Sequence, residues 1–156
     1  MIPVRRVVLL IIVLALAGCG GGDDADSGDL SAGEFLQEIT ADHLRGEFSE
    51  SWEDLHPAHQ ELISQIQLVY CGEREPTPTE DTTVRIVSVR PVTVALPEIP
   101  ERRVQAVRIE LRDREGVVDR YTAHAVRVGD RWRWVLTPAF VRALESGKCP
   151  DGSPLP

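Results

Sequence analysis

Residues 107–136 read VRIELRDREGVVDRYTAHAVRVGDRWRWVL, a series of apolar and polar alternations interrupted by two turn signals. Val107, Ile109 and Leu111 alternate with charged residues, which is typical of a strand with one buried face. Turns at 113–116 and at the Gly-Asp pair 129–130 lead into further strands over 117–128 and 131–136. The stretch therefore predicts an antiparallel meander.

The chain on either side of this stretch completes an α+β pattern. Residues 82–96 are rich in Val, Ile and Thr and predict a fourth strand, in which Pro91 indicates an edge position or a bulge. A capping box of Ser31 and Glu34 opens a predicted helix over 31–46. Two more helices are expected, one capped by Ser49 or Ser51 and one running from Pro57 to residue 72; a short helix follows residue 137. We expect N-terminal helices packed on a curved antiparallel sheet of about four strands.

Two segments carry a resemblance to a known group of folds. They are SWEDLHPAHQ, residues 51–60, and VGDRWRWVL, residues 128–136. Together with helices that precede a meander, they resemble the nuclear transport factor 2-like (cystatin-like cone) superfamily over roughly residues 30–146. The resemblance implies a long helix across a curved sheet and a cone that can hold a ligand. The superfamily includes isomerases, dehydratases, transport factors and accessory domains, so it does not fix an activity.

The first nineteen residues indicate where in the cell the protein is located. Arg5 and Arg6 precede eleven apolar residues at 7–17, too few for a membrane span of about 20 residues but suited to a secretory signal. Small residues then lead to Cys19, an arrangement that resembles the lipobox of bacterial lipoproteins. The resemblance implies a signal peptide over 1–18, a diacylglycerol on the Cys19 thiol and a protein anchored on the extracytoplasmic face of the cell membrane. The alternative is an ordinary secretory signal or short anchor with an incidental cysteine.

The rest of the chain is expected to form a tether, one domain and a tail. Residues 19–29 are rich in Gly and Asp and predict a flexible tether, followed by a domain over 30–149 and a tail over 150–156. The net charge of −8 argues against nucleic acid as a partner. With Cys19 lipidated, Cys71 and Cys149 remain, and an extracytoplasmic location favours a disulfide between them over a reactive thiol.

Candidate catalytic residues are few. Cone-fold enzymes, by the resemblance, place an Asp or His base beside a Tyr or a second acid, and here Asp42, Tyr121 and His124 are the available groups. Tyr121 and His124 are an odd number of residues apart, so strand alternation sends them to opposite faces. His43 falls on the apolar side of the first helix and is interpreted as a core histidine.

Aromatic, histidine and arginine residues offer further candidates. Trp52, Trp132 and Trp134 can line a ligand pocket, although alternate aromatic residues on a strand are also typical of a core. His56 and His59 with Glu53 have a spacing that metal sites use, but a histidine before Pro57 is better explained as a helix cap, so we expect no metal and no cofactor. Four arginines can form a basic face of the sheet: Arg108, Arg112, Arg131 and Arg133. The alternative is an ordinary solvent-exposed sheet face on which carboxylates balance the arginines.

These observations lead to two hypotheses. The first is a non-catalytic, membrane-anchored accessory module that binds a small apolar ligand or an envelope protein. The second is a small-molecule isomerase or dehydratase with Asp42 or His124 as the base.

Overall fold

The computed structural model describes residues 30–75, 79 and 81–156. The predicted signal peptide, Cys19 and the tether lie outside these residues. The described elements are α1 (Ala32–Leu44), α2 (Phe48–Glu53), α3 (Pro57–Gln60), α4 (Gln65–Gly72), β1 (Thr83–Leu96), β2 (Ile99–Arg112), β3 (Val117–Val128), β4 (Arg131–Trp134) and α5 (Pro138–Glu145).

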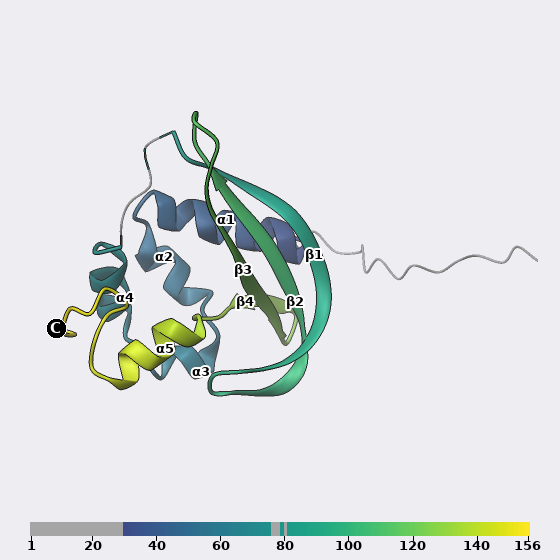
Figure 1. Cartoon of the computed structure of the whole chain (residues 1–156). Helices are drawn as coiled ribbons and strands as arrows, with labels where there is room; N and C mark the ends of the chain where they lie inside the picture. Colours follow the sequence, from purple (N-terminus) through teal and green to yellow (C-terminus); the bar gives the residue numbers. More distant parts are fainter. Residues whose placement is uncertain (1–29, 76–78, 80) are drawn as a thin grey trace, which may run out of the picture.

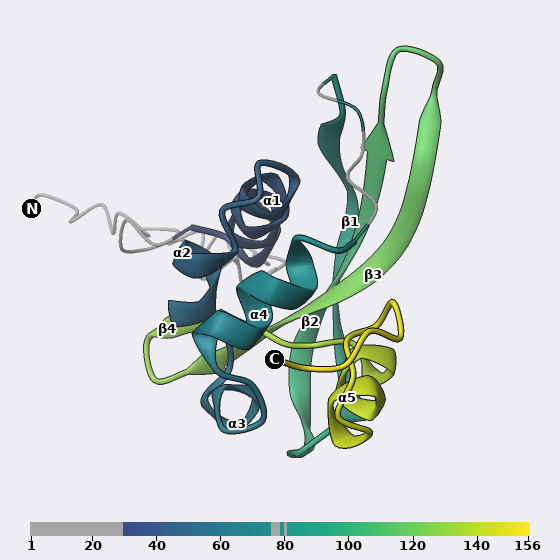
Figure 2. The same cartoon turned by 90° about the vertical axis from the view of Figure 1, so that its left-hand side faces the viewer.

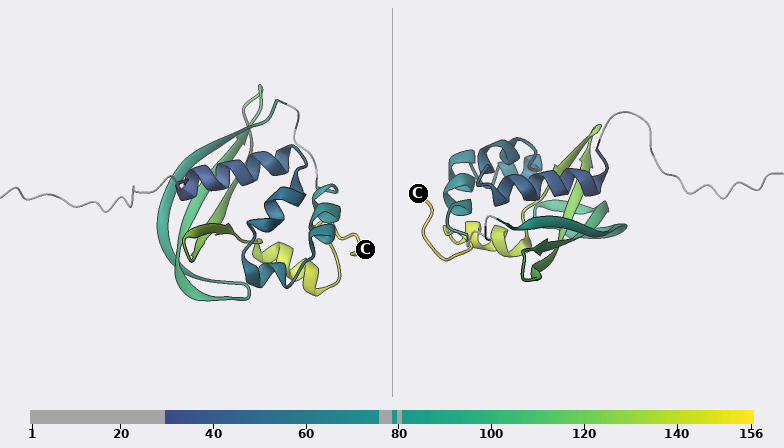
Figure 3. Two further views of the ribbon diagram at one scale, coloured as in Figure 1. Left: turned by 180° about the vertical axis from the view of Figure 1, so that it is seen from behind. Right: turned by 90° about the horizontal axis from the view of Figure 1, so that it is seen from above.

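The four strands form one antiparallel sheet in the order β1-β2-β3-β4, which confirms the predicted meander. Val107 of β2 pairs with Val89 of β1 and with Ala123 of β3. β1 is an edge strand, which is one of the two positions that Pro91 indicated, because an edge strand tolerates a residue without an N–H group. The β1–β2 hairpin is long and bends around α1 (Figures 1 and 3). β4 begins where expected but ends two residues earlier, at Trp134.

The helix ends follow the sequence in two places. Ser31 accepts a hydrogen bond from the Glu34 backbone at 3.3 Å while the Glu34 carboxylate accepts from the Ser31 backbone at 2.9 Å, which is the predicted capping box. Thr137 caps α5 by accepting from the Phe140 backbone. Both helices therefore begin where the capping pattern placed them.

The prediction of one helix over 57–72 was wrong. α3 stops at Gln60, and Ser64 starts α4 through a second capping box with Gln67. α2 also differs, because it begins at Phe48 without a side-chain cap, and Ser51 lies inside it with its hydroxyl donating to the Phe48 carbonyl.

Two apolar clusters lie on opposite sides of the sheet. α1 places Phe35, Leu36 and Ile39 in the first cluster, together with alternate residues of β2 and β3. The second cluster joins the β1–β2 turn to the start of α3 and the end of β4, with Ile99 and Val126 fully buried. Because Ala125 belongs to the first cluster and Val126 to the second, the sheet is covered on both faces at this end. In Figure 2, α1, α2, α3 and α4 lie to the left of β1, and α5 lies to its lower right.

His59 ties three segments together inside this end of the molecule. Its Nδ1 accepts a hydrogen bond from the Leu136 backbone at 2.9 Å, so Nε2 carries the proton and donates to the Pro97 carbonyl at 2.8 Å. The residue is fully buried, and burial lowers the pKa of its imidazole. A neutral His59 therefore holds α3 against both the β1–β2 turn and the segment after β4.

Replacing this histidine should be costly. His59→Leu keeps the volume but leaves the Leu136 N–H and the Pro97 carbonyl without a partner, at about 2–4 kcal/mol of unfolding free energy. Urea denaturation measures the loss. His56→Asn is the matched control, because Asn also caps a helix, and it should change stability by less than about 1 kcal/mol. Equal losses in the two variants would contradict this role of His59.

The predicted disulfide is present. Cys71 at the end of α4 is bonded to Cys149 after α5, and the two residues are 78 positions apart with a Cα–Cα distance of 5.3 Å. Both are buried. The bond therefore connects the helical half of the chain to the segment that follows the sheet.

Candidate functional site

A cavity of about 940 Å³ lies where the end of α1, the end of α4 and the β2–β3 turn region meet. We call it the α1–β3 cavity. Its apolar surface comes from Leu44, Phe48, Leu111 and Val118. The polar or charged residues around it are Thr40, His43, Arg45, Glu73, Glu75, Thr79, Thr82, Asp113, Asp119 and Tyr121.

The Tyr121 hydroxyl lies on one wall of this cavity. It is 3.2 Å from Thr40 Oγ1, and Thr40 donates its only hydroxyl proton to the Leu36 carbonyl at 2.7 Å. Tyr121 is therefore the donor to Thr40. Burial raises the pKa of the Tyr121 phenol, so it is neutral at physiological pH.

His43 occupies the inner end of the cavity. Its Nε2 is 2.8 Å from Ser51 Oγ, which itself donates to the Phe48 carbonyl at 3.0 Å, so His43 donates to Ser51 and Nδ1 is unprotonated. Phe48 stacks on the imidazole and Trp134 meets it edge-on, both at 5.1 Å between ring centroids. Burial lowers the pKa of His43 to about 4. His43 is thus a neutral, apolar-packed wall group with one lone pair.

A smaller cavity of about 110 Å³ continues from the same wall toward α5. Its lining shares His43, Phe48, Gly72 and Glu75 with the α1–β3 cavity. Gly72 is required here because a Cβ atom would lie 2.6 Å from the Phe48 ring. The close approach of α4 to Phe48 therefore shapes both cavities.

The charge of the lining is predominantly negative. Carboxylates are supplied by Glu73, Glu75, Asp113 and Asp119. The guanidinium of Arg45 is already paired, with Asp42 and with Glu47. Although the Glu75 side chain is exposed in part, desolvation and the nearby Asp151 raise the pKa of its carboxyl group. A cation placed in the cavity would relieve this unfavourable environment.

The predicted catalytic residues do not converge. Tyr121 lines the cavity, but Asp42 pairs with Arg45 and is not part of the lining. Desolvation raises the pKa of the Asp42 carboxyl group. His124 pairs in register with Ala106 and occupies the opposite parity to Tyr121 on β3, as the odd spacing predicts. Burial lowers the pKa of His124.

The three tryptophans belong to the core more than to a pocket. The Trp52 indole donates to the Ile63 carbonyl at 3.2 Å, and the Trp132 indole donates to the Leu30 carbonyl at 3.0 Å. Both pack against the first apolar cluster. Trp134 is buried, donates to the Ser51 carbonyl and borders the smaller cavity but not the α1–β3 cavity.

The candidate histidine pair has structural partners. His56 Nδ1 accepts from the Ala58 backbone as the N-cap of α3, which agrees with the capping interpretation. Both ring nitrogens of His59 are engaged by backbone groups, which leaves it no lone pair for a metal ion. Within the described part of the chain, no cluster of three potential metal ligands occurs.

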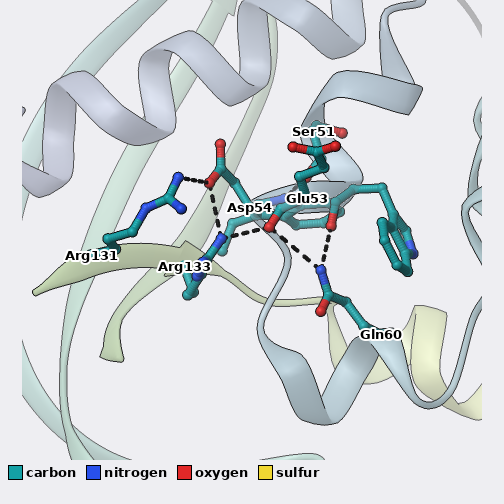
Figure 4. Close-up of polar contacts among 8 residues, drawn as sticks. Ser51, Glu53, Asp54, Gln60, Arg131 and Arg133 are labelled. Atoms are coloured by element: carbon teal, nitrogen blue, oxygen red, sulfur yellow. Dashed lines mark hydrogen bonds and ion pairs between the residues drawn. The ribbon is translucent and has the colours of Figure 1, made fainter. Parts of the chain in front are cut away.

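Arg131 and Arg133 fix α2 to β4 instead of extending a basic face (Figure 4). Asp54 accepts from both, at 3.3 Å and 3.0 Å. Arg133 also donates to the Glu53 carbonyl at the end of α2, and Gln60 donates to the same carbonyl. These two arginines therefore satisfy carbonyl and carboxylate groups at a helix end.

Sequence reasoning missed most of the groups that line the cavity, including Thr40 and all four carboxylates. Thr40 and Glu75 have no local pattern that marks them, because they meet only through the packing of α1, α4 and β3. His43 was correctly placed on the apolar side of its helix, but no local pattern in the sequence shows that it also borders a cavity.

No protein family, curated protein or solved structure shows a significant match to this chain. Among residues 30–75, 79 and 81–156, no helix is long and apolar enough to cross a membrane.

Proposed function

We propose that this protein is a lipid-anchored module outside the cytoplasm that binds a small ligand with an apolar body and a cationic amine. The observation that carries the proposal is the α1–β3 cavity, about 940 Å³ in volume. Apolar side chains of Leu44, Leu111 and Val118 would contact the body of the ligand, and the negative charge of the lining would attract the amine. Tyr121 and His43 would fix the ligand's orientation through one hydrogen bond each.

We infer binding in preference to acid–base catalysis. A proton-transfer site requires an acid and a base within reach of one substrate. Asp42 and His124, the bases of the isomerase or dehydratase hypothesis, do not line the cavity with Tyr121. His43 does line the cavity, but burial keeps its pKa at about 4, so it is a weak proton acceptor near neutral pH.

A cone-type domain of the nuclear transport factor 2-like kind is part of the same proposal. It is supported by α1 packing against all four strands and by the bend of the β1–β2 hairpin around it. A cavity between this helix and the sheet is where such a domain would hold a ligand.

The membrane anchor rests on the residues around Cys19. We expect the cellular protein to carry a diacylglycerol on that thiol and to sediment with membranes. Cys19→Ala should move it to the soluble extracytoplasmic fraction, since the anchor would be lost. Intact-mass spectrometry and fractionation measure the two effects. A wild-type mass without acyl groups, or unchanged membrane sedimentation of the variant, would contradict the anchor.

Ligand binding is tested with three probes of one length: hexylamine, hexanol and hexanoate. We expect hexylamine to bind at least about tenfold more tightly than hexanoate, a difference of 1.4 kcal/mol, because the lining is acidic. Val118→Arg adds a cation at an exposed lining position and should weaken hexylamine binding by about the same factor. Val117→Arg is the control, because Val117 is next to Val118 in the chain but does not belong to the lining. Equal binding of hexylamine and hexanoate, or equal effects of the two variants, would overturn the proposal.

A further inference from the structure

The face of the sheet opposite α1 carries a surplus of positive charge. The strand register places Arg85, Glu110 and Arg120 in one cross-strand row and Ser88, Arg108 and Thr122 in the next. Arg90 follows in the row after that, beside Ala106. These side chains have the parity opposite to Val107 and Ile109, which face α1.

The only carboxylate of these rows, Glu110, is surrounded by guanidinium groups. Its Oε1 accepts from Arg120 Nε at 2.8 Å, and its Oε2 lies 3.6 Å from both Arg85 and Arg112. The hydrogen bond from Arg120 lowers the pKa of Glu110, so it is ionised. Three guanidinium groups therefore share one negative charge. Oε2 is buried and has no hydrogen-bond partner in the part of the chain that the structure describes.

A groove of about 290 Å³ lies beside this cluster, and we call it the arginine groove. It is lined by Arg90, Arg108 and Arg120, with hydroxyl groups from Ser88 and Thr122. Tyr121 borders both this groove and the α1–β3 cavity. Three strands thus direct donors toward one small volume.

Within the described part of the chain, the guanidinium groups of Arg90 and Arg108 have no partner, although acidic residues are in excess. The chain has 25 acidic and 17 basic residues. Yet neither guanidinium group forms an ion pair or a hydrogen bond with residues 30–75, 79 or 81–156. They are diagonal neighbours on adjacent strands, where like charges repel. A bound anion would turn this repulsion into attraction.

We propose that the arginine groove is a binding site for a phosphate group. Guanidinium forks match phosphate oxygens in pairs, and charge-assisted hydrogen bonds of this kind are about twice as strong as neutral ones. The Ser88 and Thr122 hydroxyls add donors for the remaining oxygens. The same chemistry fits a soluble phosphorylated molecule and the headgroup of an anionic phospholipid. The site is separate from the α1–β3 cavity and does not depend on the amine proposal.

Pyrophosphate titration of the purified chain at low ionic strength tests this site. We expect saturable binding that Arg90→Gln and Arg108→Gln each weaken by about tenfold, since each removes a charge-assisted contact. Arg103→Gln is the matched control. It removes the same charge from an exposed position of β2 outside the groove and should change the affinity by less than about twofold.

The outcomes are distinguishable. Saturable binding with loss confined to the two groove variants supports the site. No saturable binding, or equal weakening in Arg103→Gln, overturns it, because net charge alone would then explain the attraction. Thermal unfolding of each variant without pyrophosphate shows that the fold is intact.

Vesicles identify the source of the phosphate. They contain equal parts of phosphatidylcholine and phosphatidylglycerol. If the protein binds these vesicles, pyrophosphate displaces it and Arg108→Gln weakens the binding, the ligand is a lipid headgroup. If Arg108→Gln and the wild type bind vesicles equally, while the groove variants bind pyrophosphate more weakly than the wild type, the ligand is a soluble phosphorylated molecule.

Discussion

Reduction of the Cys71–Cys149 disulfide should lower the free energy of unfolding by about 4 kcal/mol. The bond closes a loop of 78 positions, and in the chain-entropy model a loop of that length restricts the unfolded ensemble by this amount. Domains of ordinary size have only about 5–15 kcal/mol of stability, so the reduced protein should lie close to its unfolding transition. Urea denaturation with and without reductant measures the difference.

The Cys71→Ala/Cys149→Ala double variant separates this effect from other thiol chemistry. It should show the same low stability as the reduced wild type, and reductant should not change it. A loss below about 1 kcal/mol on reduction would show that the bond contributes little and that α4 and the segment after α5 are held by packing alone.

Acidification from pH 6.5 to pH 4 should destabilise the fold by about 3 kcal/mol through His43. Its pKa is about 4 in the folded protein and 6.5 when unperturbed, and each unit is worth 1.36 kcal/mol. Between these values the unfolded chain binds the proton and the folded chain does not, so stability is complete above pH 6.5 and falls as the pH falls. Burial also lowers the pKa values of His56, His59 and His124, which adds to the loss.

The His43→Gln variant isolates the contribution of His43. Its side-chain amide can donate to Ser51 as the imidazole does, but it does not titrate. The variant should lose about 3 kcal/mol less than the wild type over the same pH interval, measured by urea denaturation at several pH values. Parallel pH profiles of the two proteins would show that His43 is not the group responsible.

The sequence predicted the sheet better than the helices. Alternation at 107–111 and the Gly129–Asp130 turn are local signals, and they define the meander because strand pairing follows from short connections. The break between α3 and α4 also had a local signal, the Ser64–Gln67 capping box, but the apolar spacing of 62–70 favoured one continuous helix. Here the capping pair, and not the apolar period, marks where the helix begins.

The sites were less predictable because they depend on contacts between distant segments. The α1–β3 cavity combines residues from 40–48, 72–75 and 111–121, and no spacing in the sequence indicates that these meet. Alternation on β2 placed Glu110 on a solvated face, whereas the structure buries it to 7% exposure. The surrounding arginines account for that difference, since they cover the carboxylate and supply its counter-charges among the residues that the structure describes.

Mapping hexylamine on the protein by NMR tests most directly whether the α1–β3 cavity binds apolar amines. We expect intermolecular nuclear Overhauser effects from the alkyl chain to the methyl groups of Leu111 and Val118, with a shift of the Tyr121 ring resonances. Hexanoate at the same concentration should produce neither effect. Absence of contacts to Leu111 and Val118, or the same contacts from hexanoate, would contradict the claim that the α1–β3 cavity binds apolar amines.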